Sequence, residues 1–239
     1  VIYTTSKFKN PQEIIDYPNI KKHLDKFSKV ITSDNKPYGL HRARNEEIFK
    51  GEKILSIRKH ERPAFSYVTL DTYVNRTFNI IKTDRVNLKY LLVLLNSKLT
   101  KFWLKEKGKM QGDIFQVDIT PITSIPLIIV SKDQEAFISL SEKMLSLNRE
   151  LQDLSQKFQR MLLRKFDLEK LSTKLQEWYL LDFSDFIKEL KRLKVKLSLS
   201  QESEWEEYFL EEKSKAIAID SEIKNTDKEI DSMVYRLYD

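Results

Sequence analysis

The sequence predicts an α+β fold, with a small mixed-sheet α/β domain over residues 1–130 and an all-α, coiled-coil-like domain over residues 131–239. All four glycines and all six prolines lie within the first 126 residues, so nothing after Pro126 interrupts a helix. Residues 1–130 hold 23 lysines and arginines against 13 acidic residues, whereas residues 131–239 hold 19 against 23. The chain therefore divides into a basic half with turns, here called the head, and an acidic helical half, the tail.

Local patterns in the head predict its elements. Pro18 opens a helical pattern, which predicts a short helix near residues 18–27. Three alternating stretches predict strands, and they cover residues 53–59, 64–70 and 77–82. The apolar run from Leu88 predicts one helix that continues through Trp103 and packs on the strands, because it is too apolar to face water. Gly108 and Gly112 then bracket a predicted loop.

The tail carries a heptad pattern. Eight apolar residues are separated alternately by three and four positions: Phe137, Leu140, Met144, Leu147, Leu151, Leu154, Phe158 and Met161. This spacing is typical of the seam of a coiled-coil-like helix. Ser200 is the predicted N-cap of a last helix. Because two seams lie on segments that can fold back, we expect a helical hairpin or bundle, with a dimer through the same seam as the alternative.

Basic and amide side chains cluster in the predicted turns and loops of the head. Arginine can read guanine, asparagine and glutamine can bind adenine with two hydrogen bonds, and lysine usually contacts phosphates. A solvated lysine-rich surface is the alternative for any single lysine. On this basis the predicted DNA-binding residues are Lys36, Arg42, Arg44, Asn45, Arg58, Lys59, Arg62, Lys109 and Gln111.

Several kinds of chemistry are missing from the sequence. The absence of cysteine excludes disulfides and thiolate metal sites, and three histidines alone do not favour a zinc site. The sequence has neither the Asn/Asp-Pro-Pro-Tyr/Phe motif of adenine methyltransferases nor the Gly-Lys-Ser/Thr of a phosphate-binding loop. We therefore predict no catalytic, cofactor-binding or metal-binding residue in this chain. No apolar run reaches a membrane span, and we expect a cytoplasmic protein.

The order of several segments resembles a known family. The segments Tyr17-Pro-Asn-Ile-Lys-Lys-His-Leu24, Gly51-Glu-Lys-Ile-Leu-Ser-Ile57 and Thr77-Phe-Asn-Ile-Ile81 are similar to the target-recognition domain of site-specific DNA methyltransferases. The run from Leu88 to Leu99 with Phe102-Trp103, the loop from Gly108 to Phe115 and Ser124-Ile-Pro126 resemble the TaqI-like C-terminal specificity domain. The tail resembles the C-terminus of type IIG restriction-modification enzymes in Phe186-Ile-Lys-Glu-Leu190, Trp205-Glu-Glu-Tyr-Phe209 and the end from Glu229 to Tyr238.

The resemblance implies a bacterial parent enzyme in which this chain selects the sequence of double-stranded DNA. An upstream domain of the same polypeptide would use S-adenosylmethionine to methylate adenine at N6, and some members also cut DNA with a magnesium-dependent nuclease. The family fixes no universal base-reading residues, so the choices above rest on charge and position alone. Two alternatives stay open: a type I-style specificity subunit, and a coiled-coil interaction protein whose basic head binds an acidic partner.

Overall fold

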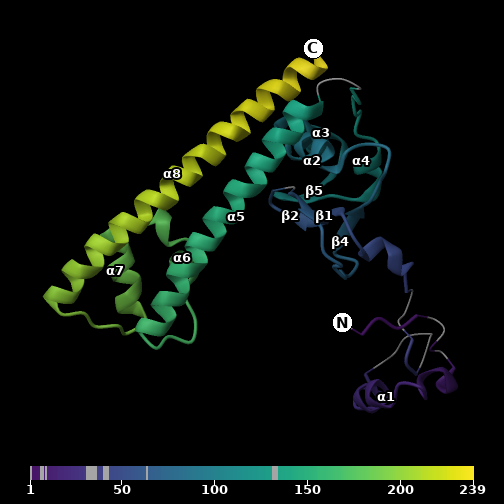
Figure 1. The fold of residues 1–239 in the computed structure, drawn as a ribbon, viewed down its shortest axis with the longest axis horizontal. Helices are drawn as coiled ribbons and strands as arrows, with labels where there is room; N and C mark the ends of the chain where they lie inside the picture. Colours follow the sequence, from purple (N-terminus) through teal and green to yellow (C-terminus); the bar gives the residue numbers. More distant parts are fainter. Residues whose placement is uncertain are drawn as a thin grey trace.

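The computed structural model describes residues 2–5, 8, 10–30, 37–39, 43–62, 64–130 and 134–239. It is an α+β fold in which two small antiparallel sheets and short helices form the head, while two long helices form the tail (Figure 1). Both sheets are antiparallel throughout their described pairings, so the expected mixed sheet is replaced by two separate ones.

The larger sheet has the strand order β3-β1-β4. Its strands are β1 (Lys53–Ile57), β3 (Phe65–Val68) and β4 (Phe78–Ile81). The central strand β1 is buried along four of its five residues because it has a neighbour on each side and α2 packs on the sheet. The sequence predicted these three strands with longer bounds.

The smaller sheet has the order β2-β6-β5 and was not predicted. It contains β2 (Lys59–His60), β5 (Lys109–Gln111) and β6 (Ile114–Gln116). The strands β5 and β6 form a hairpin where the sequence predicted a loop. Gly112 makes the turn with φ of +60°, a conformation that glycine adopts without steric cost. The first predicted strand, residues 53–59, is divided at Arg58 between the two sheets.

The apolar run of the head forms two helices, α2 (Leu88–Asn96) and α3 (Lys98–Lys107). The expected single helix is broken at Ser97, which has extended backbone angles and whose hydroxyl accepts from the N–H of Thr100. One face of α2 packs on the sheet through Leu91, Leu92 and Leu95. As a result, α2 is buried on nearly all sides, as its apolar composition predicts.

The tail is an antiparallel helical hairpin of α5 (Gln134–Lys165) and α8 (Leu199–Tyr238), as Figure 1 shows. At the end remote from the head, three short helices fill the space between them: α6 (Thr173–Gln176), η4 (Trp178–Leu180) and α7 (Phe183–Arg192). Phe158 stacks on Trp178 with ring centroids 3.8 Å apart, at the centre of this second core. The predicted hairpin or bundle is thus present, but α8 begins after Ser198, whose side chain caps it together with Gln201, and Ser200 lies inside the helix.

The head and the other end of the tail share a third core. Tyr90, Val93 and Leu94 of α2 pack against Phe137 of α5 and against Ile230 and Val234 of α8. The hydroxyl of Tyr238 also donates to the carbonyl of Pro126 at 2.6 Å. The two halves of the chain are therefore fixed to each other by buried apolar contact.

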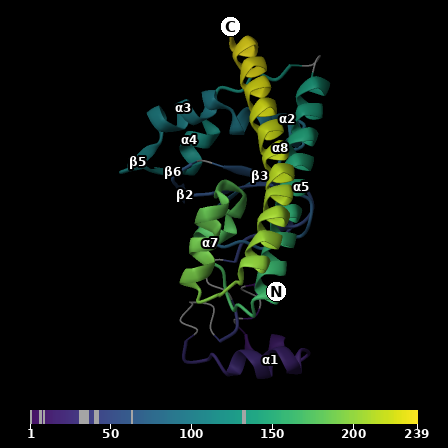
Figure 2. The ribbon, with the colours of Figure 1, turned by 90° about the vertical axis from the view of Figure 1, so that its left-hand side faces the viewer.

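The remaining elements lie at the edges of the head. They are η2 (Pro11–Ile14), α1 (Pro18–Asp25), η3 (Glu46–Phe49) and α4 (Ile119–Thr123). The helix α1 confirms the prediction at Pro18 and lies apart from the sheets, as both views show (Figures 1 and 2). None of the helices in the described parts of the chain is long and apolar enough to cross a lipid bilayer.

Candidate nucleic-acid interface

The smaller sheet places basic and amide side chains in one row. Lys59 on β2, Gln116 on β6 and Lys109 on β5 are direct cross-strand partners, so their side chains lie on the same face. Gln111 follows on that face two residues after Lys109. The opposite face carries Phe115, which is buried in the core of the head. The row therefore faces outward, and Figure 2 shows β5 on the side of the head away from α5 and α8.

Arg58 joins the two sheets through its backbone. Its N–H donates to the carbonyl of Thr77 at 2.8 Å, and its carbonyl accepts from the N–H of Val117 at 2.7 Å. The side-chain amide of Asn79, which is buried, donates to the carbonyl of Val117 at 2.8 Å and strengthens this joint. The small sheet is thus held on the larger one by hydrogen bonds around a single residue.

The side chain of Arg58 is used within the protein. Its guanidinium forms an ion pair with Asp118 at 2.5 Å and contacts the carbonyl of Arg76 at 3.4 Å. The hydrogen bond from Arg58, reinforced by one from Gln116, holds the pKa of the Asp118 carboxyl below its ordinary value, although partial burial acts in the other direction. Arg58 therefore orients Asp118 and Gln116 and is less available to a base than the sequence suggested.

An open depression of about 530 Å³ lies where the two sheets meet. It is lined by Ile57, Arg58, Lys59, Arg76, Thr77 and Gln116. Three of these six residues are cationic, and only Arg58 among them has an acidic partner in the described structure. Such a surface can accept an anion, because each unpaired cation keeps its hydrogen-bond donors for an incoming ligand.

Some cations near the two sheets are engaged inside the protein and others are not. At the end of β1 that begins with Lys53, three lysines are engaged, whereas Arg85 is exposed and has no acidic partner among the described residues. Lys50 pairs with Glu47, Lys82 donates to the carbonyls of Glu47 and Lys50, and Lys89 pairs with Glu142. At the other end, Lys59, Arg62, Arg76 and Lys109 are exposed and have no acidic partner among the described residues.

Lys53 itself is fully buried, and its ammonium donates to the carbonyls of Gly51 at 2.6 Å and Leu70 at 2.8 Å. Burial lowers its pKa. It serves the fold and cannot contact a ligand.

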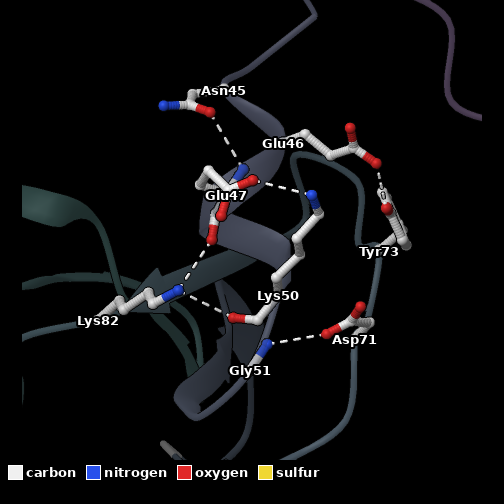
Figure 3. Close-up of polar contacts among 8 residues, drawn as sticks. All are labelled: Asn45, Glu46, Glu47, Lys50, Gly51, Asp71, Tyr73 and Lys82. Atoms are coloured by element: carbon white, nitrogen blue, oxygen red, sulfur yellow. Dashed lines mark hydrogen bonds and ion pairs between the residues drawn. The ribbon is translucent and has the colours of Figure 1, made fainter.

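Asn45 and Arg44 lie with the engaged cations, away from the small sheet. Figure 3 shows the side chain of Asn45 directed at the backbone of Glu47, whose N–H it caps at 3.1 Å to begin η3. In the same view Lys82 reaches the carbonyls beneath η3, and Gly51 donates its N–H to Asp71. The carbonyl of Arg44 accepts from the hydroxyl of Tyr3, and its side chain is exposed. Asn45 thus has a local structural role that its amide type did not reveal.

The structure brings together Arg58, Lys59, Lys109 and Gln111 from the predicted set, with the exposed Arg62 just after β2. It does not bring Arg44 and Asn45 to them. Lys36 and Arg42 lie outside the described residues. Their roles in DNA binding all stay predictions.

Sequence reasoning missed two residues of the depression, Arg76 and Gln116. Arg76 stands alone in a turn with no neighbouring basic residue, so no cluster signalled it. Gln116 was placed in a loop, and only its position in β6 shows that it lies between two lysines. Within the described residues, no group of three or more histidine or acidic side chains is arranged to hold a metal ion.

Two family comparisons match the chain. Residues 11–127 match the TaqI-like C-terminal specificity domain, and residues 130–234 match a family described as "Domain of unknown function (DUF8810)". A search of the curated proteins gave no match. The first family is a specificity domain and not a catalytic one, and its role is DNA sequence recognition in restriction-modification enzymes. Residues 11–127, which contain both sheets and the depression between them, are therefore the part of the chain that is similar to a TaqI-like C-terminal specificity domain.

Proposed function

We propose that this chain supplies sequence choice to a type IIG-like restriction-modification enzyme that methylates adenine at N6. The catalytic site would belong to an upstream domain of the same polypeptide, together with S-adenosylmethionine and, where the parent also cuts DNA, magnesium. The specificity-domain match over residues 11–127 supports the recognition part of this proposal. The lack of a methyltransferase motif within residues 1–239 agrees with a separate catalytic domain.

The observation that carries the proposal is a group of exposed cations at and beside the depression. Lys59 and Arg76 line it, Lys109 lies beside Gln116 at its edge, and none of the three has an acidic partner among the described residues. Exposed cations grouped on one surface can neutralise neighbouring phosphates, and the counterions released from DNA then favour binding. The amides in the same row provide groups that can contact base edges.

The tail would set the position of this reader in the parent enzyme. It has more acidic than basic residues and is fixed to the head by a shared core. We propose that the tail contacts the catalytic domains and not the DNA, since an acidic surface is repelled by phosphates.

Salt titration tests the DNA-binding part. Duplex DNA should bind this chain with a dissociation constant that rises steeply with salt. Arg76→Ala and Lys109→Ala should each lower the slope of log K against log salt by about 0.9, which is the loss of one phosphate contact. The matched control is Lys170→Ala, which removes an exposed lysine of the tail. A slope that neither head variant changes, or binding without sequence preference, would contradict the proposal.

Methylation by the full-length polypeptide tests the enzymatic part. With S-adenosylmethionine it should methylate adenine at N6 within one short sequence. If sequence-specific binding is present but methyl transfer is absent, the recognition role stands and the methyltransferase role fails. A second recognition domain in the same polypeptide would instead indicate a type I-style specificity subunit.

A further inference from the structure

Charged neighbouring side chains fix the orientation of the amide groups of the two glutamines of the small sheet. The ammonium of Lys59 donates to Oε1 of Gln111 at 3.3 Å. To do so, the lysine side chain crosses over β6, because Lys59 lies on β2 and Gln111 on β5 at the two edges of the sheet. Nε2 of Gln116 donates to Oδ2 of Asp118 at 2.8 Å.

The chemistry of the neighbours dictates both amide orientations. An ammonium can only donate, so it selects the oxygen of Gln111 and leaves its NH₂ group to the outside. An ionised carboxylate can only accept, so Asp118 selects the nitrogen of Gln116 and leaves its oxygen. Because Arg58 forms an ion pair with Asp118, the carboxylate keeps its charge at neutral pH. The outward face thus offers a fixed pattern: donors from Lys59 and Gln111, and an acceptor from Gln116.

This pattern matches one kind of base pair in the major groove. A G·C pair presents two adjacent acceptors, N7 and O6 of guanine, followed by the N4 amino donor of cytosine. An A·T pair presents an acceptor, a donor and an acceptor, and would place its adenine amino group against one of the two donors. Because the Lys59 ammonium lies at the Gln111 amide, whereas the Gln116 amide turns toward Asp118, the two donors are adjacent and the acceptor stands at one end of the pattern. This order complements G·C and conflicts with A·T.

We propose that the face formed by Lys59, Gln111 and Gln116 reads a G·C base pair, with Lys59 and Gln111 on guanine and Gln116 on cytosine. This rests on the proposed function, since it requires that the head bind duplex DNA. The hairpin β5–β6 is suited to the task because a two-stranded ribbon fits the major groove. Lys109, next to Gln116 on the same face, is then placed at a phosphate.

Selection from a randomised duplex library tests the assignment. The wild-type chain should enrich a G·C pair at one position of the selected duplexes. Gln111→Ala should weaken the preference for G·C at that same position. The loss should be on the order of tenfold to a hundredfold, the discrimination given by a good pair of base contacts. Gln152→Ala is the matched control, because Gln152 is exposed on α5. Gln116→Ala should weaken the preference for the same base pair.

Lys59→Met gives a sharper outcome, since it keeps most of the side-chain length but frees the oxygen of Gln111. Glutamine with a free oxygen can bind adenine with two hydrogen bonds. The variant should therefore accept adenine where the wild type selects guanine. A purely structural role of Lys59 would weaken binding without this change of base.

The possible failures are distinguishable. A wild-type chain that binds duplex DNA without sequence preference contradicts the proposed function. A wild-type chain with a clear preference contradicts only this assignment if Gln111→Ala leaves it unchanged, if the affected position is A·T, or if Lys59→Met still selects guanine alone.

Discussion

Asp231 of α8 holds the first turn of α3 with both oxygens of its carboxylate. Oδ1 accepts from the backbone N–H of Lys98 at 2.9 Å, and Oδ2 forms an ion pair with the Lys98 ammonium at 2.9 Å. The Asp231 side chain is 6 % exposed, whereas that of Lys98 is 62 % exposed. A carboxylate from the tail therefore caps a helix of the head, where the partial positive charge of the helix N-terminus favours it.

Asp231→Ala should lower the free energy of unfolding by about 1–3 kcal/mol, because it leaves the N–H of Lys98 without its partner. Lys98→Ala should cost less than Asp231→Ala, since it keeps the helix cap and leaves only Oδ2 of the buried carboxylate without its ion pair. Urea unfolding of the two variants measures the difference. Equal losses would mean that the helix cap contributes nothing beyond the ion pair.

Asp118 should make stability depend on pH. Its pKa in the folded chain lies below the ordinary value of 3.8, chiefly because of the hydrogen bond from Arg58. Folding therefore favours the ionised form, and this contribution is present above pH 4 and lost as the pH falls through the lowered pKa. Asp118→Asn should show a shallower loss of stability between pH 4 and pH 2 in denaturant unfolding. Parallel curves for the variant and the wild type would contradict this assignment.

At single residues, the sequence predicted the kind of surface better than the role of each side chain. Lys59, Lys109 and Gln111 were chosen for their charge or amide in turns, and the small sheet brings them together. Arg58 was chosen for the same reason, yet its partner Asp118 lies 60 residues further along the chain. A pairing over that distance depends on the fold and leaves no local signal. Asn45 likewise has a capping role that only the onset of η3 reveals.

At the scale of elements, the hairpin β5–β6 depends on the way α3 ends. The N–H of Gly108 donates to the carbonyl of Leu104, and a Cβ at Gly108 would lie 2.3 Å from that oxygen. Gly108 therefore lies too close to the backbone of α3 to carry a side chain. The position of β5 follows from this contact, since Lys109 comes directly after it.

Gly108→Ala should move β5 out of register with β6 and weaken DNA binding by about tenfold or more, the loss expected when one base contact is displaced. Gly112→Ala is the comparison, because its Cβ would meet nothing within 4 Å and only the positive φ adds a cost of about 1 kcal/mol. Measured affinities for duplex DNA should rank Gly108→Ala well below Gly112→Ala. The reverse order would show that the turn, and not the attachment to α3, positions the hairpin.

Long periodic elements were predictable, whereas short ones were not. The heptad pattern predicted α5, and the apolar run predicted the buried α2. The sequence did not predict the break at Ser97, because the apolar spacing continues through it. The Asp231 carboxylate that caps the second helix comes from the tail and leaves no local signal. The strands β5 and β6 are three residues each, too short to show alternation.

At the scale of the whole molecule, the shared core makes the head depend on the tail. Tyr90, Val93 and Leu94 are each at most 4 % exposed, and their apolar partners include Phe137 and Val234 of the long helices. Removal of the tail would expose this surface to water at a cost of about 25 cal/mol for each square ångström. The compositional boundary near residue 130 therefore crosses a packed interface.

A chain of residues 1–130 alone should lose cooperative unfolding or aggregate at temperatures where the intact chain is folded. Thermal unfolding followed by circular dichroism measures this. As a milder change within the intact chain, Phe137→Ala should lower stability by about 3–5 kcal/mol. An isolated head with the same melting temperature as the full chain would show that the shared core is dispensable.

The hairpin of α5 and α8 extends well beyond the head, and its far end is remote from the small sheet (Figure 1). Since the basic excess lies in the head and the acidic excess in the tail, the charge of the molecule is distributed unequally along its length and gives it an electric dipole. The electric field of a DNA duplex exerts a torque on this dipole and turns the head toward the phosphates before contact. The orientation acts within about 10 Å at 0.1 M salt, so dilute buffer should accelerate the first encounter.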